Sequence, residues 1–420
     1  MPNKEMSHKR PRLWTADFSL TLGIALFAFM ACQALNNGTP LYIANVGGNT
    51  GYAGSLILVF SACAAIARLA SGRIIDNMGR RHVMVFGAVL MLAGTILAIP
   101  FPGLIPQIPF RAMQGFGFAC VTTASSTAAA DVLPHERLGE GIGYYTLGQS
   151  LGMAVGPAFG IFLCSLVFPE SLFAGAAGVC AVLTILVSCC NYEKHPERLP
   201  ETSEYRLLAA RRQREATEDE PAPQAQESAE AKKHPLLSNF IEKRAFVGAI
   251  PMLIICLGFA IPTSYTALYA EQLGFPNAGL FFLIGAIAMT LTRFLGGRLL
   301  DIVSPRALFF TTVTCGIVMF LMMAFAQNEY WLYASGVFFG VSMGFSFPLL
   351  SSMSVKNTPP ERWGAANAMF YLANDLGVGI GAFAWGLVAD AAGFFPVLVG
   401  GAAMHLLSFI VALFLFPRSK

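Results

Sequence analysis

The sequence predicts an all-α integral membrane protein with twelve transmembrane helices, arranged as two pseudo-symmetric six-helix halves. The first observation is composition: 55% of the 420 residues are hydrophobic and 12% are charged, against roughly a quarter charged in an average soluble domain. The second is an internal repeat, because polar residues of the first half recur 225 positions later without a gap. A parallel repeat in an apolar chain is typical of membrane proteins built by duplication.

The repeat keeps one register over roughly ninety residues of each half. The residues matched in the first half are Arg68, Gly72, Arg73, Asp76, Arg81, Gly115, Pro134, Glu136, Arg137, Gly139, Gly152 and Gly156. Their partners in the second half are Arg293, Gly297, Arg298, Asp301, Arg306, Gly340, Pro359, Glu361, Arg362, Gly364, Gly377 and Gly381. Three positions break the symmetry: Arg111 faces Gly336, Pro157 faces Ala382, and Asp375 faces Ser150.

Apolar runs long enough to cross a bilayer as helices, about 20 residues each, occur six times before a charged central segment and six times after it. We place them at 14–37, 51–75, 83–101, 106–131, 138–168, 171–191, 245–271, 277–301, 306–327, 330–356, 361–391 and 394–416. The chain therefore divides into an N-terminal half (1–192), a cytoplasmic charged linker (193–244) and a C-terminal half (245–420).

The loops alternate in charge. One set carries Lys and Arg, whereas the loops around 38–50, 102–105, 169–170, 272–276, 328–329 and 392–393 contain neither. By the positive-inside rule, both termini and the central linker are cytoplasmic, and the protein is a multi-pass protein of the cell inner (plasma) membrane. The linker is rich in Ala, Glu, Arg, Pro and Gln, and is read mainly as a tether, with a regulatory or partner-binding role as the alternative.

Composition also excludes several function classes. The basic residues lie at loop ends and form no patch beside stacking aromatics, so we expect no nucleic-acid partner. The nine cysteines lie in apolar stretches without a CxxC spacing and are read as core residues, so no metal or other cofactor is expected. No phosphate-binding loop and no nucleophile–base set is present, which argues against ATP hydrolysis and against an enzyme.

The most specific motif is residues 72–82, GRIIDNMGRRH, between the second and third spans. It resembles the cytoplasmic loop signature of the major facilitator superfamily, G-x-x-x-D-x-x-G-R-[RK]. The resemblance implies that this loop clasps the other half of the protein in one conformation and releases it in another. The second-half counterpart keeps Gly and Asp, but Ser304 and Pro305 stand in place of Gly79 and Arg80. The predicted conformational gate comprises Arg68, Gly72, Asp76, Gly79, Arg80, Arg81, Arg293, Gly297, Asp301 and Arg306.

Two further strings narrow the resemblance. Residues 111–117, RAMQGFG, look like an intramembrane motif of the superfamily, and a buried guanidinium there needs a partner or a wet cavity. Residues 148–160 resemble the helix motif of its proton-coupled drug exporters, carried here by Gly152, Gly156, Pro157 and Gly160. The glycines form a smooth helix face, which could also be a packing surface alone. The chain departs from that branch in its first span, which lacks the acid that many such exporters carry at membrane depth.

In the fold that the resemblance implies, the first, fourth, seventh and tenth spans line a central cavity. The predicted substrate and proton pathway comprises Asn36, Asn37, Arg111, Gln114, Gln149, Tyr265, Asn374 and Asp375. Asp375 lies about 14 residues past Glu361, roughly 21 Å into the membrane. A carboxylate there could carry a proton or bind a cationic substrate; the alternative is a static ion pair with Arg111.

The sequence thus predicts a secondary active transporter of the drug/proton antiporter type. Its expected activity is proton-coupled efflux of a small amphipathic organic compound by alternating access, with protons and the lipid bilayer as partners and the monomer as the functional unit. One alternative is proton-coupled uptake of a small organic solute or anion, with Arg111 as the partner of the anion. The other is a transporter-like membrane sensor or scaffold that acts through the charged linker.

Overall fold

The computed structural model describes residues 12–416, leaving out 102, 104, 167, 169, 201, 204, 208–209, 211–241, 357 and 359–362. At 71–77, 135, 139, 294–302 and 363–364 it describes the backbone but not the side chains. The described chain is all-helical, as predicted. Its long helices are α1 Ala16–Asn45, α2 Thr50–Met78, α3 Arg80–Leu97, α4 Gln107–Val132, α5 Leu138–Cys164, α6 Ser171–Cys189, α9 Phe246–Gln272, α10 Gly279–Ile302, α11 Pro305–Ala324, α12 Glu329–Lys356, α13 Trp363–Ala392 and α14 Phe394–Leu415.

The helix boundaries follow from local sequence chemistry. Thr15 accepts a hydrogen bond from the Phe18 amide at 3.2 Å and so caps α1. Ser304 caps α11 in the same way, and Pro305 occupies its first turn, where a missing N–H costs nothing. Gly79 at φ 84° and Gly393 at φ 77° make the tight turns before α3 and α14.

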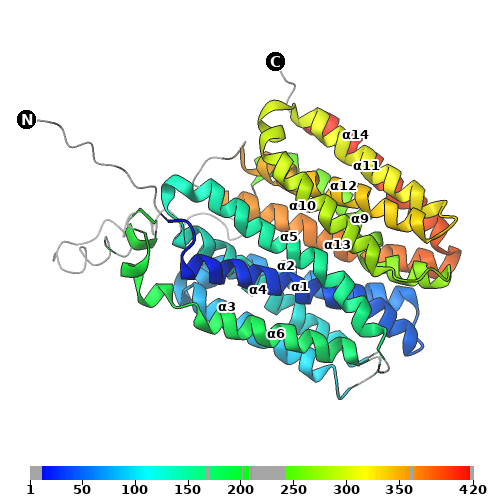
Figure 1. Cartoon of the computed structure of the whole chain (residues 1–420), viewed down its shortest axis with the longest axis horizontal. Helices are drawn as coiled ribbons and strands as arrows, with labels where there is room; N and C mark the ends of the chain where they lie inside the picture. Colours follow the sequence, from blue (N-terminus) through cyan, green and yellow to red (C-terminus); the bar gives the residue numbers. More distant parts are fainter. Residues whose placement is uncertain are drawn as a thin grey trace, which may run out of the picture.

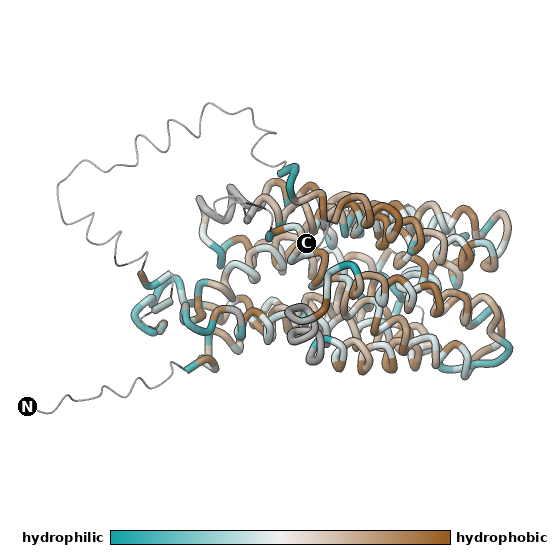
Figure 2. Tube along the Cα trace, turned by 90° about the horizontal axis from the view of Figure 1, so that it is seen from above, coloured by the Kyte–Doolittle hydropathy of each residue, from teal (hydrophilic) through white to brown (hydrophobic). Residues whose placement is uncertain are grey.

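Ten of the described helices are long and apolar enough to span a membrane by length and composition. The other two long helices, α4 and α10, are more polar or shorter in their apolar part: α4 contains Arg111, Gln114 and Asp131, and the apolar part of α10 is Gly279–Arg293. We call the end of the bundle where α1 begins and α14 ends the termini end, and the opposite end the far end. Along the helices apolar residues predominate, and hydrophilic residues gather toward the ends (Figure 2).

The first helix is longer than predicted, because it ends at Asn45 and not at residue 37. The turn-forming residues near Pro40 suggest a loop, but the segment is held by packing. An added Cβ at Gly38 would meet the Leu172 side chain of α6 at 2.4 Å, and Tyr42 is fully buried against Phe173. Tertiary burial therefore overrides the weak helix propensity of this stretch.

The two halves lie side by side, with α5 and α13 in the middle (Figure 1). Contacts between the halves run along three helix pairs: α2 with α13, α5 with α10, and α1 with α9. The first two pairs are related by the 225-residue repeat. The interface is therefore built twice from equivalent helices.

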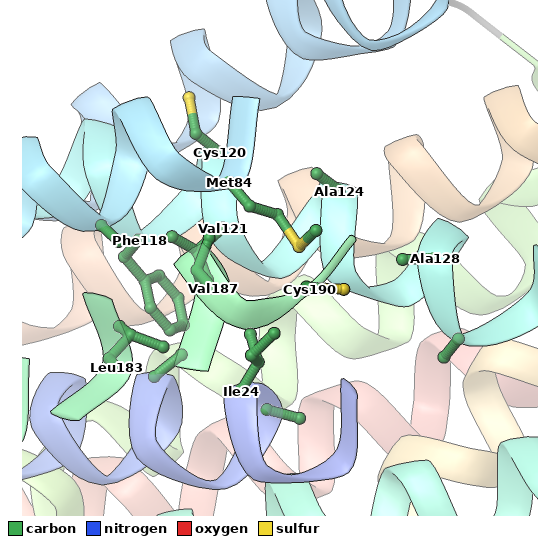
Figure 3. Packing of buried hydrophobic residues seen from close by; sticks show 14 of the residues in the cluster. Ile24, Met84, Phe118, Cys120, Val121, Ala124, Ala128, Leu183, Val187 and Cys190 are labelled. Atoms are coloured by element: carbon green, nitrogen blue, oxygen red, sulfur yellow. The ribbon is translucent and has the colours of Figure 1, made fainter. Parts of the chain in front are cut away.

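Each half has its own apolar core. In the N-terminal half, side chains of α1, α3, α4 and α6 interlock, as Figure 3 shows for Ile24, Met84, Val121 and Leu183 among others. A second cluster fills the C-terminal half around Phe259, Phe281, Phe320 and Phe370. Most buried apolar residues thus pack within one half, and a small cluster of Ile57, Ala260 and Ala382 joins the halves.

Glycines bring helices into close contact within each half. An added Cβ would lie 2.4 Å from the Leu26 carbonyl oxygen at Gly152 and 2.3 Å from the Ala34 oxygen at Gly160, so α5 packs on the backbone of α1. In the second half, Gly377 and Gly381 approach Leu253 and Leu257 of α9 in the same way. The predicted glycine face is thus a packing surface inside each half.

The first part of the central segment packs on the N-terminal half. Glu193 accepts hydrogen bonds from the backbone amides of Arg80 and Arg81 at 2.7 and 3.2 Å, and Ser203 forms a β-bridge with Pro134. Leu199 joins the N-terminal core. The predicted linker region beyond this stretch, 211–241, lies outside the described residues.

Replacing Gly152 with Ala should lower the thermal unfolding midpoint of the detergent-solubilised protein. Its Cβ would meet backbone and not a flexible side chain, and such overpacking costs about 1–3 kcal/mol. Gly178 of α6 is the matched control, because nothing lies within 4 Å of its added Cβ. Gly178→Ala should raise the midpoint through helix propensity, and equal effects of the two changes would contradict the packing role.

Candidate functional site

A buried ion pair joins the two halves. The Arg68 Nε of α2 donates to the Asp375 Oδ2 of α13 at 2.6 Å, and the two side chains are 7% and 10% exposed. Arg68 lies ten residues from Met78 and Asp375 twelve residues from Trp363, which places both roughly 15–18 Å from the termini end. The pair therefore lies deep within the bundle.

Polar and aromatic groups surround this pair. The Asn374 side-chain amide donates to Asp375 Oδ1 at 3.2 Å, and Thr123 Oγ1 lies 3.4 Å from an Arg68 Nη1. The Arg68 guanidinium carbon lies 5.0 Å from the ring centroid of Tyr371 and 5.9 Å from that of Phe118. Hydrogen bonds and aromatic faces offset part of the cost of burying the charges.

The repeat-related contact is made by the other helix pair. Arg293 of α10 donates from Nη1 to the Thr146 carbonyl oxygen of α5 at 2.9 Å, and the same group contacts Ser150 Oγ. Arg293 is the equivalent of Arg68, and Ser150 is the equivalent of Asp375. The Arg68 contact is thus an ion pair, whereas in the equivalent Arg293 contact the guanidinium donates to a neutral hydroxyl.

Arg111 of α4 has a different environment from the one predicted. Its Nη2 donates to Asn36 Oδ1 at 2.5 Å and its Nη1 to Gln114 Oε1 at 3.0 Å. The guanidinium also lies 5.0 Å from the ring centroid of Phe60, and the side chain is fully buried. The interpretation of Asp375 as a static partner of Arg111 is wrong, because Asp375 pairs with Arg68.

Three other predicted pathway residues have these partners. Asn37 donates to the Gln33 carbonyl oxygen at 3.0 Å within α1. Gln149 lies close to Tyr145 and Tyr371, and Tyr371 lies against Arg68 of the ion pair. The Tyr265 hydroxyl donates to the Ala382 carbonyl oxygen. It packs directly against Gly54 and Gly386, where an added Cβ would lie only 2.7 Å from it.

The predicted gate loop is tied down within its own half. Gly79 is the N-cap residue before α3. Arg80 Nε pairs with Asp131 of α4 at 3.0 Å, and Arg81 Nη2 donates to the Ser188 carbonyl oxygen of α6 at 3.2 Å. Arg306 of α11 donates to the Phe416 oxygen at 2.8 Å, just beyond the C-terminus of α14. The side chains of Gly72, Asp76, Gly297 and Asp301 lie outside the described residues. Their predicted gating role stays a prediction.

A contact between the halves that the sequence analysis missed lies at the far end. The Asp390 carboxylate at the end of α13 accepts the backbone amides of Thr50 and Gly51, the first residues of α2, at 2.9 and 2.7 Å. A carboxylate on a helix N-terminus is favoured by the helix dipole. We call this contact the far-end latch. The only sequence signal for it was an acid at the outer end of a span.

Pro157 and the glycines beside it add no polar side chain to the site, and Gly152, Gly156 and Gly160 pack α5 on α1. Among the described residues, no group of three or more His, Cys, Asp or Glu side chains could hold a metal ion. The chemistry available at the described site is therefore reversible ion pairing and hydrogen bonding between two helical halves.

Comparison with known proteins identifies this architecture. The model of the Major Facilitator Superfamily matches residues 21–328 and 277–420, which together cover most of the chain. The chain belongs to the major facilitator superfamily. Like other members it is a multi-pass membrane protein and a secondary transporter, not an enzyme.

Two similar proteins carry names that describe export or resistance. The staphylopine export protein of Staphylococcus aureus strain Mu50 is 24% identical over 382 residues, covering 88% of this chain and 89% of that protein. A putative multidrug resistance protein MdtD of Yersinia enterocolitica is 25% identical over 186 residues, covering 43% of this chain and 39% of that protein. Among solved structures, a D-xylose–proton symporter matches with a TM-score of 0.71 at 15% identity, covering 96% of this chain and 97% of that one, which shows the shared fold.

Replacing Asp375 with Leu should destabilise the protein by about 3–5 kcal/mol, because it leaves Arg68 buried without its countercharge. Replacing both residues, as Arg68→Met with Asp375→Leu, should recover most of this loss. Thermal unfolding of the four proteins of this double-mutant cycle measures the coupling. Additive effects would show that the two side chains do not form a pair in the folded protein.

Replacing Asp390 with Ala should favour separation of the halves at the far end, since it removes both bonds to the start of α2. Spin labels at Asn45 and Leu273, which are exposed ends of α1 and α9, report the separation as a distance distribution. We expect the longer-distance population to rise by up to about tenfold. An unchanged distribution would rule out the latch, and Ser165→Ala at the repeat-related position is the control.

Proposed function

We propose that this protein exports a small amphipathic organic compound in exchange for protons, by alternating access. In this proposal the termini end faces the cytoplasm, both termini are cytoplasmic, and the protein works as a monomer in the plasma membrane. The two halves rock about the central site and expose it to one side at a time.

The observation that carries the proposal is the Arg68–Asp375 pair. It joins a helix of each half at 2.6 Å in a poorly hydrated place. An ionised Asp375 holds Arg68 and so holds α2 against α13. Uptake of a proton by Asp375 neutralises the carboxylate and weakens this attraction, which lets the halves separate there. Proton binding is thereby linked to the movement that exposes the site.

Contacts at the far end fit a transporter resting in one of its two states. The far-end latch, together with the close approach of Gly51 to Leu387 and of Gly386 to the Thr50 carbonyl oxygen, holds α2 against α13 there. Opening toward the far side then requires the latch and the Arg68–Asp375 pair to be broken together. A proton arriving from that side would favour this step.

The export direction is supported by similarity and by one helix motif. Both named relatives, one described as an export protein and one as a putative multidrug resistance protein, point to outward transport. The Gly152 to Gly160 string with Pro157 resembles that of proton-coupled exporters. Asn36, Gln114, Gln149 and the other polar residues of the predicted pathway are proposed to line the route.

Purified protein in liposomes tests this function. With an imposed pH gradient the wild type should concentrate a substrate, whereas Asp375→Asn should retain downhill movement and lose the proton-driven part. Asp375→Glu, which keeps the titratable group, serves as the control. Concentrative transport by Asp375→Asn would exclude Asp375 as the proton carrier. Flux in the same direction as the proton would favour uptake, and no flux under any gradient would favour a sensor.

A further inference from the structure

The two contacts between the halves made by Arg68 and by Arg293 together hold more positive than negative charge. Arg68 and Arg293 carry two guanidinium charges, Asp375 carries the one carboxylate described beside them, and the remainder is one uncompensated positive charge. The excess lies on Arg293. Among the described residues its side chain donates to a carbonyl oxygen and a hydroxyl, and no carboxylate lies within ion-pairing distance.

Comparison of the two halves shows which countercharge Arg293 lacks. The repeat places Arg68 and Arg293 on equivalent helices and gives them equivalent neighbours, at 375 and 150. Ser150 is 1% exposed and its hydroxyl already donates to the Thr146 oxygen at 2.7 Å. The fold thus provides a place for a carboxylate opposite Arg293, and the sequence leaves it without one. Arg293 is only partly buried, but a charge at this depth without a countercharge is still costly, and a bound anion would offset that cost.

The geometry around Arg293 leaves donors for such a ligand. Its Nε is buried and has no hydrogen-bond partner among the described residues. The ring centroid of Tyr371 lies 5.0 Å from the Arg68 guanidinium carbon, and Arg293 and Gln149 also lie close to Tyr371. We call Arg68, Asp375, Arg293, Ser150 and Tyr371 the arginine cradle. Their helices place Arg293 and Ser150 roughly 14–18 Å from the termini end, the depth of the ion pair.

We propose that the arginine cradle binds a carboxylate of the transported compound, so that the substrate is an organic anion. Arg293 is its principal partner, because its planar guanidinium can donate two parallel bonds to a carboxylate. This inference deepens the proposed function and rests on it for the statement that the bound anion is transported. Expulsion of an anion is also favoured by a membrane potential that is negative inside.

The ring of Tyr371 and the neighbouring rings of Phe347 and Phe370 suit the apolar part of such a compound. The ring centroids of Phe347 and Tyr371 lie 5.7 Å apart, and Phe347 also stacks edge-to-face on Phe370 at 5.0 Å. Phe347 and Tyr371 are only partly buried, so their surfaces are available. A substrate with an aromatic or aliphatic body and one carboxylate would place the body there and the charge on Arg293.

The sharpest test supplies the missing carboxylate. Ser150→Asp should pair with Arg293 as Asp375 pairs with Arg68, raise the thermal midpoint of the ligand-free protein, and occupy the site for an anion. Ser188→Asp, which adds the same charge at the exposed end of α6, is the control. Arg293→Gln, which removes the guanidinium, should also abolish anion binding without the gain from a new ion pair.

The probes are benzoate, phenylacetate, phthalate and citrate, each compared with its uncharged amide, and binding is read as thermal stabilisation of the purified full-length protein. We expect at least one carboxylate to stabilise the wild type and the Ser188→Asp control, and its amide to do so at least about tenfold more weakly. Ser150→Asp and Arg293→Gln should lose the response. No response to any carboxylate, an equal response to the amide, or a response retained by Ser150→Asp would overturn the proposal.

Flux measurements separate this inference from the proposed function. If a carboxylate binds through Arg293 but is not moved into or out of liposomes under any gradient, the anion site is supported and the proposed transport is refuted. Proton-driven flux of cationic compounds, combined with no carboxylate binding, keeps the transporter and refutes the anion site.

Discussion

The poor hydration of the membrane interior is the constraint on which the rest of this structure depends. Each buried charge must find a partner, and the Arg68–Asp375 pair does so across the boundary between the halves. The ion pair therefore compensates two poorly hydrated charges and also holds α2 of one half against α13 of the other. Neutralising one partner would change the solvation and the link together, and the proposed proton coupling rests on this property of the pair.

Rigid halves are needed for this link to have an effect at a distance. Close contact of α5 with α1 through Gly152 and Gly160, and of α13 with α9 through Gly377 and Gly381, makes each half a compact body. The far-end latch and the ion pair then lie on the same two helices, α2 and α13. The two contacts are therefore joined by continuous helix and not by a loop.

Much of the fold could be predicted from the sequence, because span length, loop charge and the repeat are local or register-based signals. The α1 extension to Asn45 could not, since it depends on packing against Leu172 of another helix. Asp375 could be singled out by its depth in the membrane and Arg68 by its repeat partner Arg293, but the sequence did not predict that the two form a pair. Side-chain partners in a helix bundle are set by which faces meet, and a single sequence carries no direct record of that.

The asymmetry between the halves was visible in the sequence, but its meaning needed the structure. Asp375 and Ser150 occupy equivalent positions in the repeat, and each contacts one of two equivalent arginines, Arg68 and Arg293. The far-end latch of Asp390 had almost no signal, because an acid near the end of a span is ordinary. Contacts between backbone amides and a distant side chain are the least predictable part of such a site.

The central claim is that Asp375 takes up and releases a proton while the protein remains folded. Infrared difference spectroscopy of the protein in lipid, recorded as the pH is lowered, detects a protonated carboxyl group directly through its C=O stretching band. The account predicts a reversible band in the wild type that is absent from Asp375→Asn and shifted in Arg68→Gln. An identical band in the wild type and in Asp375→Asn would contradict it.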